Sequence, residues 1–388
     1  MTSATPVATT GARFGEPPRP WAIICGGGTA GHVVPAIAIG RALVAQGHPA
    51  DSIQFLGARH GIEGRLVPEA GFRVTLLPGR GLQRRLTLAN LRAAGGLALA
   101  AGKAVAMVAR QRPSVMVSVG GYASMAGVVA SVVMRVPLVV VEQNAAPGAS
   151  NRLAARVARN AAVAFPGTDL PRAVLTGNPV RQEVLAVDRS AAGQAAGRQA
   201  LGLPAGATVI VAVGGSLGAR SVNRAVLELA ELWRDRSAVA IYHVVGARDW
   251  DMISQSCPVL PDGGLWYRQV RYEDHMEVVY AAADVAVCRA GASTVSELAA
   301  VGLAAVLVPL PGAPNDHQTA NARALVDAGA ARLLPDAQLS GQRLAAELEP
   351  LLDPATRDPM AAQATTVAHR QAAAEVAVLV EQASATRG

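Results

Sequence analysis

Residues 287–321 read VCRAGASTVSELAAVGLAAVLVPLPGAPNDHQTAN, and this stretch predicts a strand, a loop, a helix and a second strand in succession. The apolar run 285–288 has the length of a buried strand. We expect the helix to begin near Thr294, because Ser293 and Thr294 are residue types that favour a helix N-terminus. A second apolar run at 305–308 predicts another strand. Strands that alternate with helices form parallel sheets, which bind ligands at the carboxyl ends of their strands.

Glu297 is the residue of this stretch with two possible roles. It follows Thr294 by three positions, so it could complete a capping box by bonding back to the helix start. It could instead face a ribose and accept hydrogen bonds from both hydroxyls, beside backbone N–H groups that favour an anion. The polar residues 315–318 (NDHQ) follow the second strand and are expected at the same crevice.

The composition indicates a two-domain protein with a large aliphatic core. The chain has 388 residues, of which 51% are hydrophobic and only 3% aromatic. A chain of this length is expected to divide into two domains. The net charge is +7, and Lys103 is the only lysine among 35 basic residues. This excess fits an anionic substrate or an anionic lipid surface. We expect no nucleic-acid partner, because there is no arginine-rich tail and no aromatic-basic motif.

The cysteines and the chain termini indicate neither a metal site nor a membrane span. Cys25, Cys257 and Cys288 are widely spaced and lack metal-ligand spacing, so we expect reduced, buried thiols of a cytosolic protein and no metal. Residues 1–18 are rich in Thr, Ala and Pro without periodicity, and they predict a disordered leader rather than a signal peptide. No uncharged apolar run reaches the ~20 residues of a spanning helix, so a soluble or peripheral protein is expected.

A glycine-rich loop, GGGTAGH at 26–32, lies between an apolar strand (21–25) and an expected helix (33–46). It satisfies the dinucleotide pattern G-x-G-x-x-G, but the tip of the next strand, FLGAR at 55–59, lacks the acid that binds ribose. This disfavours NAD or FAD. His32 could cap the helix start, or its imidazole could serve in proton transfer or in phosphate binding.

Arginines and apolar residues gather at 80–112, with two possible meanings. The leucines can line one face of a core helix, which is the commoner case. Apolar residues beside a cluster of arginines also describe a patch that binds an anionic bilayer. The residues concerned are Arg80, Arg84, Arg85, Leu86, Leu88, Leu91, Arg92, Leu97, Leu99, Lys103, Val105, Val108, Arg110 and Arg112.

The second half of the chain repeats the plan of residues 21–46. An apolar strand (208–213) leads into GGSLGA (214–219) and an amphipathic helix (221–233). The repeat predicts two similar α/β halves. The polar segment 182–206 is the expected boundary, with domains at 19–181 and 182–368 and a C-terminal helix (369–388) that packs back on the first. A single helix is expected over 358–382.

Seven motifs together resemble the MurG family of glycosyltransferases. They are GGGTAGH (26–32), GGY (120–122), EQN (142–144), GNPVR (177–181), GGSLGA (214–219), CRAGASTVSE (288–297) and DHQTANA (316–322). The resemblance covers roughly residues 20–385. It implies a GT-B fold, in which two Rossmann-like α/β domains with parallel sheets face a central cleft. The donor sugar nucleotide would bind mostly to the second domain, and the lipid acceptor mostly to the first.

The resemblance also implies the reaction. N-acetylglucosamine would pass with inversion from UDP-N-acetylglucosamine to undecaprenyl-diphosphate-linked muramoyl pentapeptide, in peptidoglycan synthesis. The protein would be peripheral to the cytoplasmic face of the cell membrane and would need no cofactor. Two rivals share parts of this pattern: a UDP-N-acetylglucosamine 2-epimerase, which needs no lipid acceptor, and a non-catalytic sugar-nucleotide sensor.

The resemblance assigns roles residue by residue. Glu297 would bind the ribose, Arg181 the uracil side or the phosphates, and Gln318 the sugar hydroxyls. The remaining donor contacts would be Ala292, Ser293, Thr294, Val295 and Ser296 with Ser216 at the diphosphate and nucleoside, and Thr29, Ala30, Gly31 and Asn144 across the cleft. Three positions depart from the family pattern: Ala30, Leu217 and Glu273.

The chemistry requires a group that accepts a proton. The acceptor hydroxyl must lose its proton as it attacks the anomeric carbon, while negative charge develops on the departing UDP. N–H groups of glycine loops and helix N-termini can stabilise that charge. His32 is the expected base or orienting group, and Glu142 is the second candidate.

Overall fold

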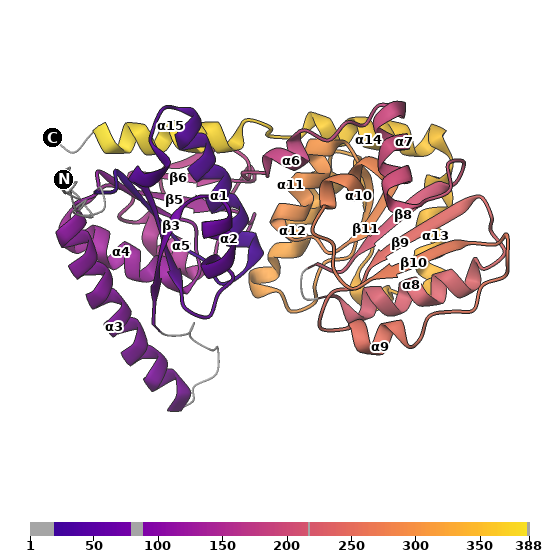
Figure 1. Cartoon of the computed structure of the whole chain (residues 1–388), viewed down its shortest axis with the longest axis horizontal. Helices are drawn as coiled ribbons and strands as arrows, with labels where there is room; N and C mark the ends of the chain where they lie inside the picture. Colours follow the sequence, from indigo (N-terminus) through magenta and orange to yellow (C-terminus); the bar gives the residue numbers. More distant parts are fainter. Residues whose placement is uncertain (1–18, 79–87, 216–217, 386–388) are drawn as a thin grey trace, which may run out of the picture.

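The computed structural model describes residues 19–78, 88–215 and 218–385, with the backbone alone for residues 88–94. The expected disordered leader, residues 1–18, lies outside the described residues. Two α/β halves lie side by side, and the C-terminal helix returns across the first half (Figure 1). The strands of the first sheet fall within residues 22–175, and those of the second within residues 208–333. The expected domain bounds, 19–181 and 182–368, stay a prediction.

The first sheet has seven parallel strands in the order β3-β2-β1-β4-β5-β6-β7. Four of them are buried along their whole length, as expected for a parallel sheet that is covered on both faces. The strands are β1 (Ala22–Cys25), β2 (Ile53–Ala58), β3 (Arg73–Leu77), β4 (Val115–Ser118), β5 (Leu138–Glu142), β6 (Asn160–Val163) and β7 (Ala173–Leu175).

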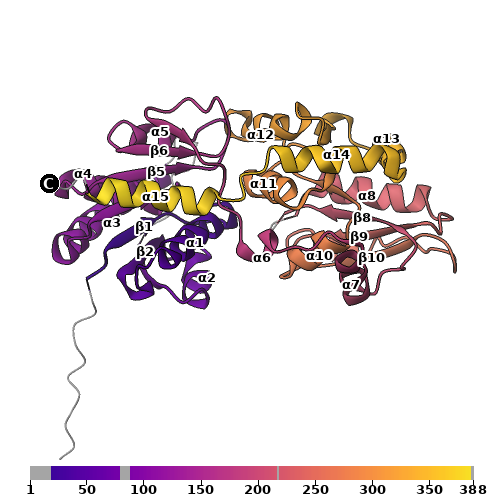
Figure 2. The same ribbon diagram turned by 90° about the horizontal axis from the view of Figure 1, so that it is seen from above.

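Helices cover both faces of this sheet, and neighbouring strand residues enter opposite cores. Ile24 packs in one core with residues of α1 and α15, while Ile23 packs in the other with residues of α3 and α4. Figure 2 shows α15 lying over the first sheet. The helices are α1 (Ala30–Ala45), α2 (Glu63–Glu69), α3 (Leu88–Gln111), α4 (Tyr122–Met134), α5 (Ala149–Ala155) and α15 (Ala372–Ala385), with a 3₁₀ turn η1 (Ala50–Ser52).

The second sheet has six parallel strands in the order β10-β9-β8-β11-β12-β13. The strands are β8 (Thr208–Val213), β9 (Val239–Val244), β10 (Trp266–Val270), β11 (Val285–Cys288), β12 (Ala304–Leu307) and β13 (Ala331–Leu333). The other elements are α6 (Gln182–Leu185), α7 (Ala191–Leu201), α8 (Arg220–Leu232), α9 (Trp250–Ser254), α10 (Met276–Ala282), α11 (Ala292–Val301), η2 (Pro314–Asp316), α12 (His317–Val326), η3 (Asp336–Gln338), α13 (Gly341–Leu348), η4 (Glu349–Leu352) and α14 (Pro354–Thr366).

Counted from its own first strand, each sheet has its first six strands in the same order, and the first sheet adds β7 at its edge. That order, third-second-first-fourth-fifth-sixth, is the Rossmann order. The repeat seen in the sequence is therefore a repeat of fold, and the predicted fold class is confirmed. Each first strand, β1 and β8, lies at the point where the strand order reverses, which is where such sheets bind ligands.

Three expected helix bounds and one expected burial were wrong. Cys257 is exposed, whereas Cys25 and Cys288 are buried as expected. The helix after the first glycine loop begins at Ala30 rather than near Val33. The helix after β11 begins at Ala292 rather than near Thr294, because Gly291 adopts the extended conformation of an N-cap residue. The single helix expected over 358–382 is two helices, α14 and α15, with residues 367–371 between them. This break lets the chain leave the second half and cross back to the first.

Polar contacts join the two halves at the carboxyl ends of their strands. The side chain of Asn321 on α12 accepts a bond from Ala145 N (2.8 Å) and donates to Asn144 Oδ1 (3.2 Å), beyond β5. Asn315 donates to the Pro147 carbonyl (3.4 Å). The loops that follow the strands of the two sheets therefore meet. Separately from these loops, Arg370 in the crossing segment donates to the carbonyls of Ala300, in the last turn of α11, and of Leu185.

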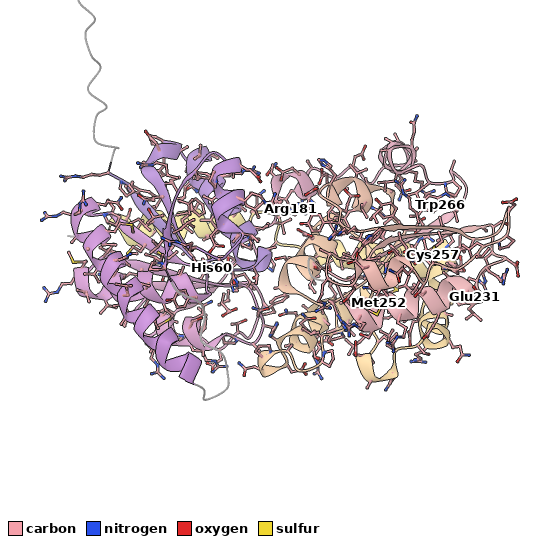
Figure 3. All side chains as sticks on the ribbon, turned by 60° about the horizontal axis from the view of Figure 1, so that its bottom comes forward. His60, Arg181, Glu231, Met252, Cys257 and Trp266 are labelled. Carbon is pink, nitrogen blue, oxygen red and sulfur yellow. The ribbon has the colours of Figure 1, made fainter. Side chains whose placement is uncertain are left out.

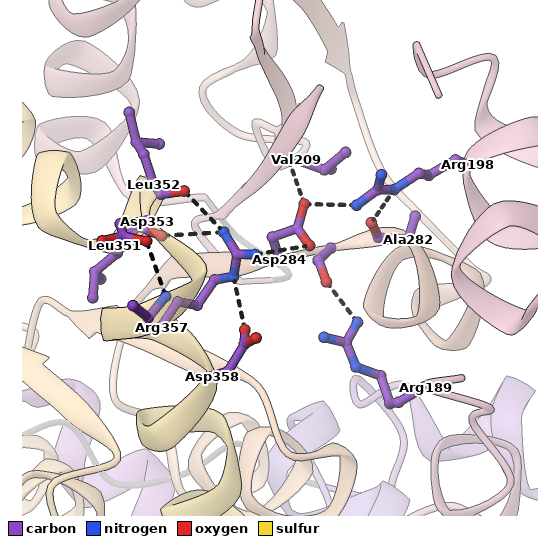
Figure 4. Close-up of polar contacts among 12 residues, drawn as sticks. Arg189, Arg198, Val209, Ala282, Asp284, Leu351, Leu352, Asp353, Arg357 and Asp358 are labelled. Carbon is purple, nitrogen blue, oxygen red and sulfur yellow. Dashed lines mark hydrogen bonds and ion pairs between the residues drawn. The ribbon is translucent and has the colours of Figure 1, made fainter. Parts of the chain in front are cut away.

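A buried cluster of charged side chains (Figure 4) lies at the amino ends of the strands of the second sheet, opposite to these loops. Asp284, directly before β11, accepts bonds from Val209 N and from Arg198 Nη2, both at 2.7 Å. Arg357 approaches the other carboxylate oxygen at 4.0 Å. Arg189 donates to carbonyls at the end of α10. The cluster fixes the start of β11, which leads into the loop at residues 289–291.

Within the described ranges, no helix combines the length and the apolar character that crossing a membrane requires.

Candidate functional site

A pocket of about 610 Å³ lies at the carboxyl end of the second sheet, at its topological switch point. Glycines 214, 215 and 218 and the starts of α8 and α11 form part of its wall. Four arginines also line it: Arg220, Arg224, Arg248 and Arg289. Backbone N–H groups at helix starts and arginine side chains both favour a bound anion. The pocket is therefore suited to a diphosphate.

Arg289 organises the floor of this pocket. It donates to the carbonyls of Val308 and Pro309 (3.1 Å each), to Ser221 Oγ (2.8 Å) and to Asp336 Oδ1 (2.6 Å). These bonds tie the loop after β11 to the end of β12 and to the start of α8. The sequence motifs did not indicate this role of Arg289, although the residue directly follows β11, as pocket residues of such sheets do.

Glu297 belongs to an interdomain group rather than to a helix cap. Its Oε2 accepts from the hydroxyl of Tyr280 (2.9 Å), and its Oε1 lies 3.4 Å from Arg181 Nη2. Arg181 lies between the two halves (Figure 3). Burial raises the pKa of Glu297, and the neighbouring Arg181 and the Tyr280 bond partly oppose this rise. The capping-box alternative was wrong, because the N-cap residue of α11 is Gly291, three residues before Thr294.

The first turn of α11 presents free N–H groups at the pocket. In the described parts of the chain no side chain caps this helix, and Thr294 lines the pocket. The buried hydroxyl of Ser293 has no hydrogen-bond partner among the described residues, and Ala292 packs in the core beside it. Val295 and Ser296 line a different cavity, so only their backbone atoms could serve a ligand in the pocket.

Gln318 lies on the same pocket, as expected. Its Oε1 accepts from Leu310 N (2.9 Å), which fixes the side chain beside the loop after β12. Ser216 and Leu217 lie outside the described residues. Glu273 accepts bonds from the Tyr242 hydroxyl (2.8 Å) and from His275 N (2.9 Å), so its carboxylate is already engaged.

His32 lies at the start of α1, on the first half of the chain. Thr29 is the N-cap residue and its Oγ1 lies 3.2 Å from His32 Nδ1, so His32 is not the cap and that alternative was wrong. The ring lies against Gly120, where an added Cβ would be 3.0 Å from Nε2. Burial lowers the pKa of His32, while the charges of Glu142 and Glu63 raise it. Ala30 and Gly31 form the same helix turn, and Gly31 is exposed.

Glu142 is 2% exposed, and hydrogen-bond donors already occupy both oxygens of its carboxylate. Its Oε1 accepts from the backbone N and the side chain of Asn144, and its Oε2 accepts from Gly148 N and from Asn151. Four donors match the roughly four lone pairs of a carboxylate. This geometry favours a supporting role for Glu142 and leaves His32 as the better candidate base. Asn144 faces Asn321 across the domain contact.

Glu63 is a residue of this site that the sequence did not reveal. It is 1% exposed, and its carboxylate accepts from Gly28 N (3.0 Å) and from Ala58 N (2.6 Å). A Cβ on Gly27, Gly57 or Gly61 would lie 2.0–2.3 Å from its side-chain atoms. The first glycine loop is therefore already filled by an internal carboxylate. This explains physically why its dinucleotide-like pattern does not indicate NAD or FAD. In the sequence, Gly57 and Gly61 were the residues that could have indicated a side chain packed closely against this loop.

Comparisons with known proteins agree with this arrangement. Residues 22–163 match the glycosyltransferase family 28 N-terminal domain, and residues 208–378 match its C-terminal domain. The crystal structure of Acinetobacter baumannii MurG superposes with a TM-score of 0.74 at 28% identity, covering 93% of this chain and 99% of that one. A UDP-GlcNAc 2-epimerase from Neisseria meningitidis superposes at 0.64 with 12% identity, which shows the fold alone.

The sequence relatives are more specific. A protein of Acidothermus cellulolyticus is 41% identical over 366 residues, which is 94% of this chain and 98% of the relative. One from Nitrosococcus oceani is 40% identical over 356 residues, 91% of this chain and 95% of the relative. Both are named UDP-N-acetylglucosamine–N-acetylmuramyl-(pentapeptide) pyrophosphoryl-undecaprenol N-acetylglucosamine transferase. The chain therefore belongs to the family of these transferases, the MurG family within glycosyltransferase family 28.

Proposed function

We propose that this protein transfers N-acetylglucosamine from UDP-N-acetylglucosamine to the muramoyl residue of undecaprenyl-diphosphate-linked muramoyl pentapeptide, in peptidoglycan synthesis. The observation that carries the proposal is the 41% identity to a transferase of this name over nearly the full length of both chains. The arginine-lined pocket at the second sheet supports a donor with a diphosphate.

We further propose how the donor lies. The diphosphate occupies the pocket at the starts of α8 and α11, near Arg289 and Thr294. The ribose extends toward Glu297 and Arg181, which already form a pair with one partly exposed member. Gln318 binds the sugar hydroxyls, on the side of the pocket formed by the loop after β12. This order matches the linear order of sugar, diphosphate and nucleoside in the donor.

The residues of the first half supply the proton transfer. The acceptor hydroxyl attacks the anomeric carbon, a new carbon–oxygen bond forms, and the bond to the UDP oxygen breaks. The hydroxyl proton passes to the neutral imidazole of His32. Glu142 and Glu63 stabilise the resulting imidazolium through their charges. The N–H groups and arginines of the pocket stabilise the negative charge that develops on UDP.

One assay tests the reaction. The enzyme is incubated with radiolabelled UDP-N-acetylglucosamine and a prenyl-diphosphate muramoyl acceptor, and the lipid product is separated. We expect label in a disaccharide lipid only when the acceptor is present. Label released as the 2-epimer without acceptor would indicate the epimerase. UDP-sugar binding without any turnover would indicate a sensor.

Glu297→Ala is expected to weaken UDP binding by about 1–3 kcal/mol, or roughly 5- to 150-fold, because it removes charge-assisted hydrogen bonds to the ribose. Calorimetric titration with UDP measures this. Glu349→Ala is the matched control, because it removes a carboxylate from an exposed ion pair with Arg236 in the same half. An unchanged UDP affinity in the Glu297 variant would take this carboxylate out of the donor site.

We also propose that the first half binds an anionic membrane surface on its cytoplasmic side. Half of the residues named for the patch at 80–112 lie outside the described side chains; of the others, α3 exposes Leu99, Lys103 and Arg110 but buries Val108 in the core. Helices α4 and α5 extend it with exposed apolar residues and a groove of about 640 Å³ that four arginines line. These residues are Val129, Val132, Val133, Leu153 and Val157, with Arg135, Arg156, Arg159 and Arg172. Apolar groups ringed by arginines are the pattern of an interfacial surface.

The double change Arg156→Glu and Arg159→Glu is expected to reduce binding to phosphatidylglycerol vesicles at least about 30-fold, since each basic residue near such a surface contributes about 1 kcal/mol. Vesicle co-sedimentation measures it, with phosphatidylcholine vesicles as the neutral reference. The control reverses two arginines of the second half, Arg234 and Arg236. Equal losses in both double variants would show a net-charge effect and not this surface.

A further inference from the structure

A second cavity, of about 280 Å³, lies where the two chain crossings between the halves meet. Its walls come from both halves: residues 164–166 beyond β6, the linker at 178–180, helices α11 and α12, and the crossing at 366–369. The two crossings touch directly, since a Cβ on Gly177 would lie 2.0 Å from the Cβ of His369. The pocket with the four arginines does not share any of these lining residues.

The lining is apolar apart from a few groups, and one of these is unusual. Phe165, Val180, Leu325 and Val367 make up much of the wall. Asn178 also lines the cavity and is 2% exposed, yet neither its Nδ2 nor its Oδ1 has a hydrogen-bond partner among the described residues. A buried amide without partners is unfavourable, and buried polar side chains without partners are rare. The amide is therefore placed to receive a partner from a ligand.

The chemistry of the walls defines that ligand. The described residues that line the cavity include no Asp, Glu, Lys or Arg, so the site favours an uncharged molecule. A primary amide can donate to Oδ1 and accept from Nδ2, which satisfies both groups of Asn178. An apolar cavity of about 150 Å³ holds a benzene ring, so about 280 Å³ has room for a ring with an amide.

We propose that this cavity is a binding site for a small uncharged molecule with an apolar ring and one primary amide. The cavity is linked to the donor site by two pairs of residues that are consecutive in the sequence. Val180 and Ser296 line the cavity, and the residues that follow them, Arg181 and Glu297, form the ion pair assigned to the ribose. A ligand that contacts both halves and both crossings binds one domain arrangement better than others, so it shifts the donor affinity.

Benzamide is the probe for the full-length protein, and toluene is the same ring without an amide. We expect saturable benzamide binding by saturation-transfer NMR, with toluene weaker by about tenfold. Asn178→Leu should lower benzamide affinity about tenfold without lowering the unfolding temperature, because it removes an amide that has no internal partner. Ala299→Leu, which fills the cavity and leaves Asn178 intact, should abolish binding.

The coupling is measured separately and rests on the proposed function. Saturating benzamide should change the UDP dissociation constant by about fivefold or more, with the reciprocal change for benzamide. Failure of UDP to bind at all would refute the proposed donor but would leave the cavity result standing. Benzamide binding that neither variant reduces would overturn the proposed site. So would competitive displacement, in which the apparent benzamide dissociation constant rises with UDP concentration without reaching a plateau. So would a clear loss of stability in Asn178→Leu.

Discussion

His32→Ala is expected to lower kcat by about 10²–10⁴-fold, the size of a lost general base, while UDP binding stays nearly unchanged. The separation follows from the geometry. His32 starts α1 in the first half and contacts Thr29 and Gly120, whereas the pocket assigned to the diphosphate is lined by the second half alone. Steady-state transfer to a lipid acceptor gives kcat, and calorimetric titration gives the UDP affinity of the same preparation.

The pH profile sharpens this prediction. His32 can accept a proton only when its imidazole is neutral, so activity is lost as pH falls through its pKa. Burial lowers that pKa from the usual 6.5, with Glu142 and Glu63 opposing. The acidic limb of kcat/KM should therefore lie below 6.5. His32→Ala should remove this limb along with most of the activity.

His60→Ala is the matched control for His32. It replaces an exposed histidine of the same half, in the turn between β2 and α2 (Figure 3). We expect kcat within about twofold of the wild-type value, since the His60 side chain is exposed and exposed substitutions usually have small effects. Full turnover in His32→Ala would reduce His32 to a structural residue and reopen the search for a base. Glu142, with four donors on its carboxylate, would need to release one of them to accept a proton.

The architecture was predictable because its signals are local. Apolar runs such as 208–213 and 285–288 end at glycine loops, and both became buried central strands. The repeat of strand, glycine loop and helix at β1 and β8 predicted two similar halves, and the first six strands have the same order in both sheets. The same local signals predicted that His32 lies at a helix start and that Gln318 lies at the carboxyl ends of the strands of the second sheet.

The parts that the sequence did not reveal depend on long-range contacts. Asn321 bonds to Asn144, 177 residues earlier in the chain, and nothing in either motif indicates that they touch. The break between α14 and α15 lies in VAHRQ (367–371), which contains neither glycine nor proline. Arg370 holds this segment through carbonyls of residues 185 and 300, so tertiary contacts rather than local preference end the helix.

Glu63 also acts through a contact between residues distant in the sequence. Its replacement is the second change that we expect to have a large effect. Its two acceptors hold Gly28 N, at a sequence distance of 35, and Ala58 N. Glu63→Ala would leave the buried N–H group of Ala58 without its partner, at a cost of about 1–3 kcal/mol, and would leave the N–H of the exposed Gly28 to water. We therefore expect the first half to lose about 1–3 kcal/mol of local stability. Hydrogen exchange should accelerate in peptides that cover residues 26–29 and 57–59, while second-half peptides keep their protection.

The catalytic consequence of Glu63 separates its charge from its shape. Glu63→Gln keeps the size of the side chain and one of its two backbone hydrogen bonds, but it removes a negative charge that raises the pKa of His32. The pKa of His32 should therefore fall further, and the acidic limb of kcat/KM should move to lower pH while kcat falls, because a less basic imidazole accepts a proton less readily. Glu69→Ala, at the exposed end of the same helix, is the control and should change neither exchange nor pH profile. A Glu63→Gln enzyme with an unshifted acidic limb would show that this carboxylate holds the loop without acting on His32. Unaltered exchange in Glu63→Ala would show that the glycine loop holds its shape without it.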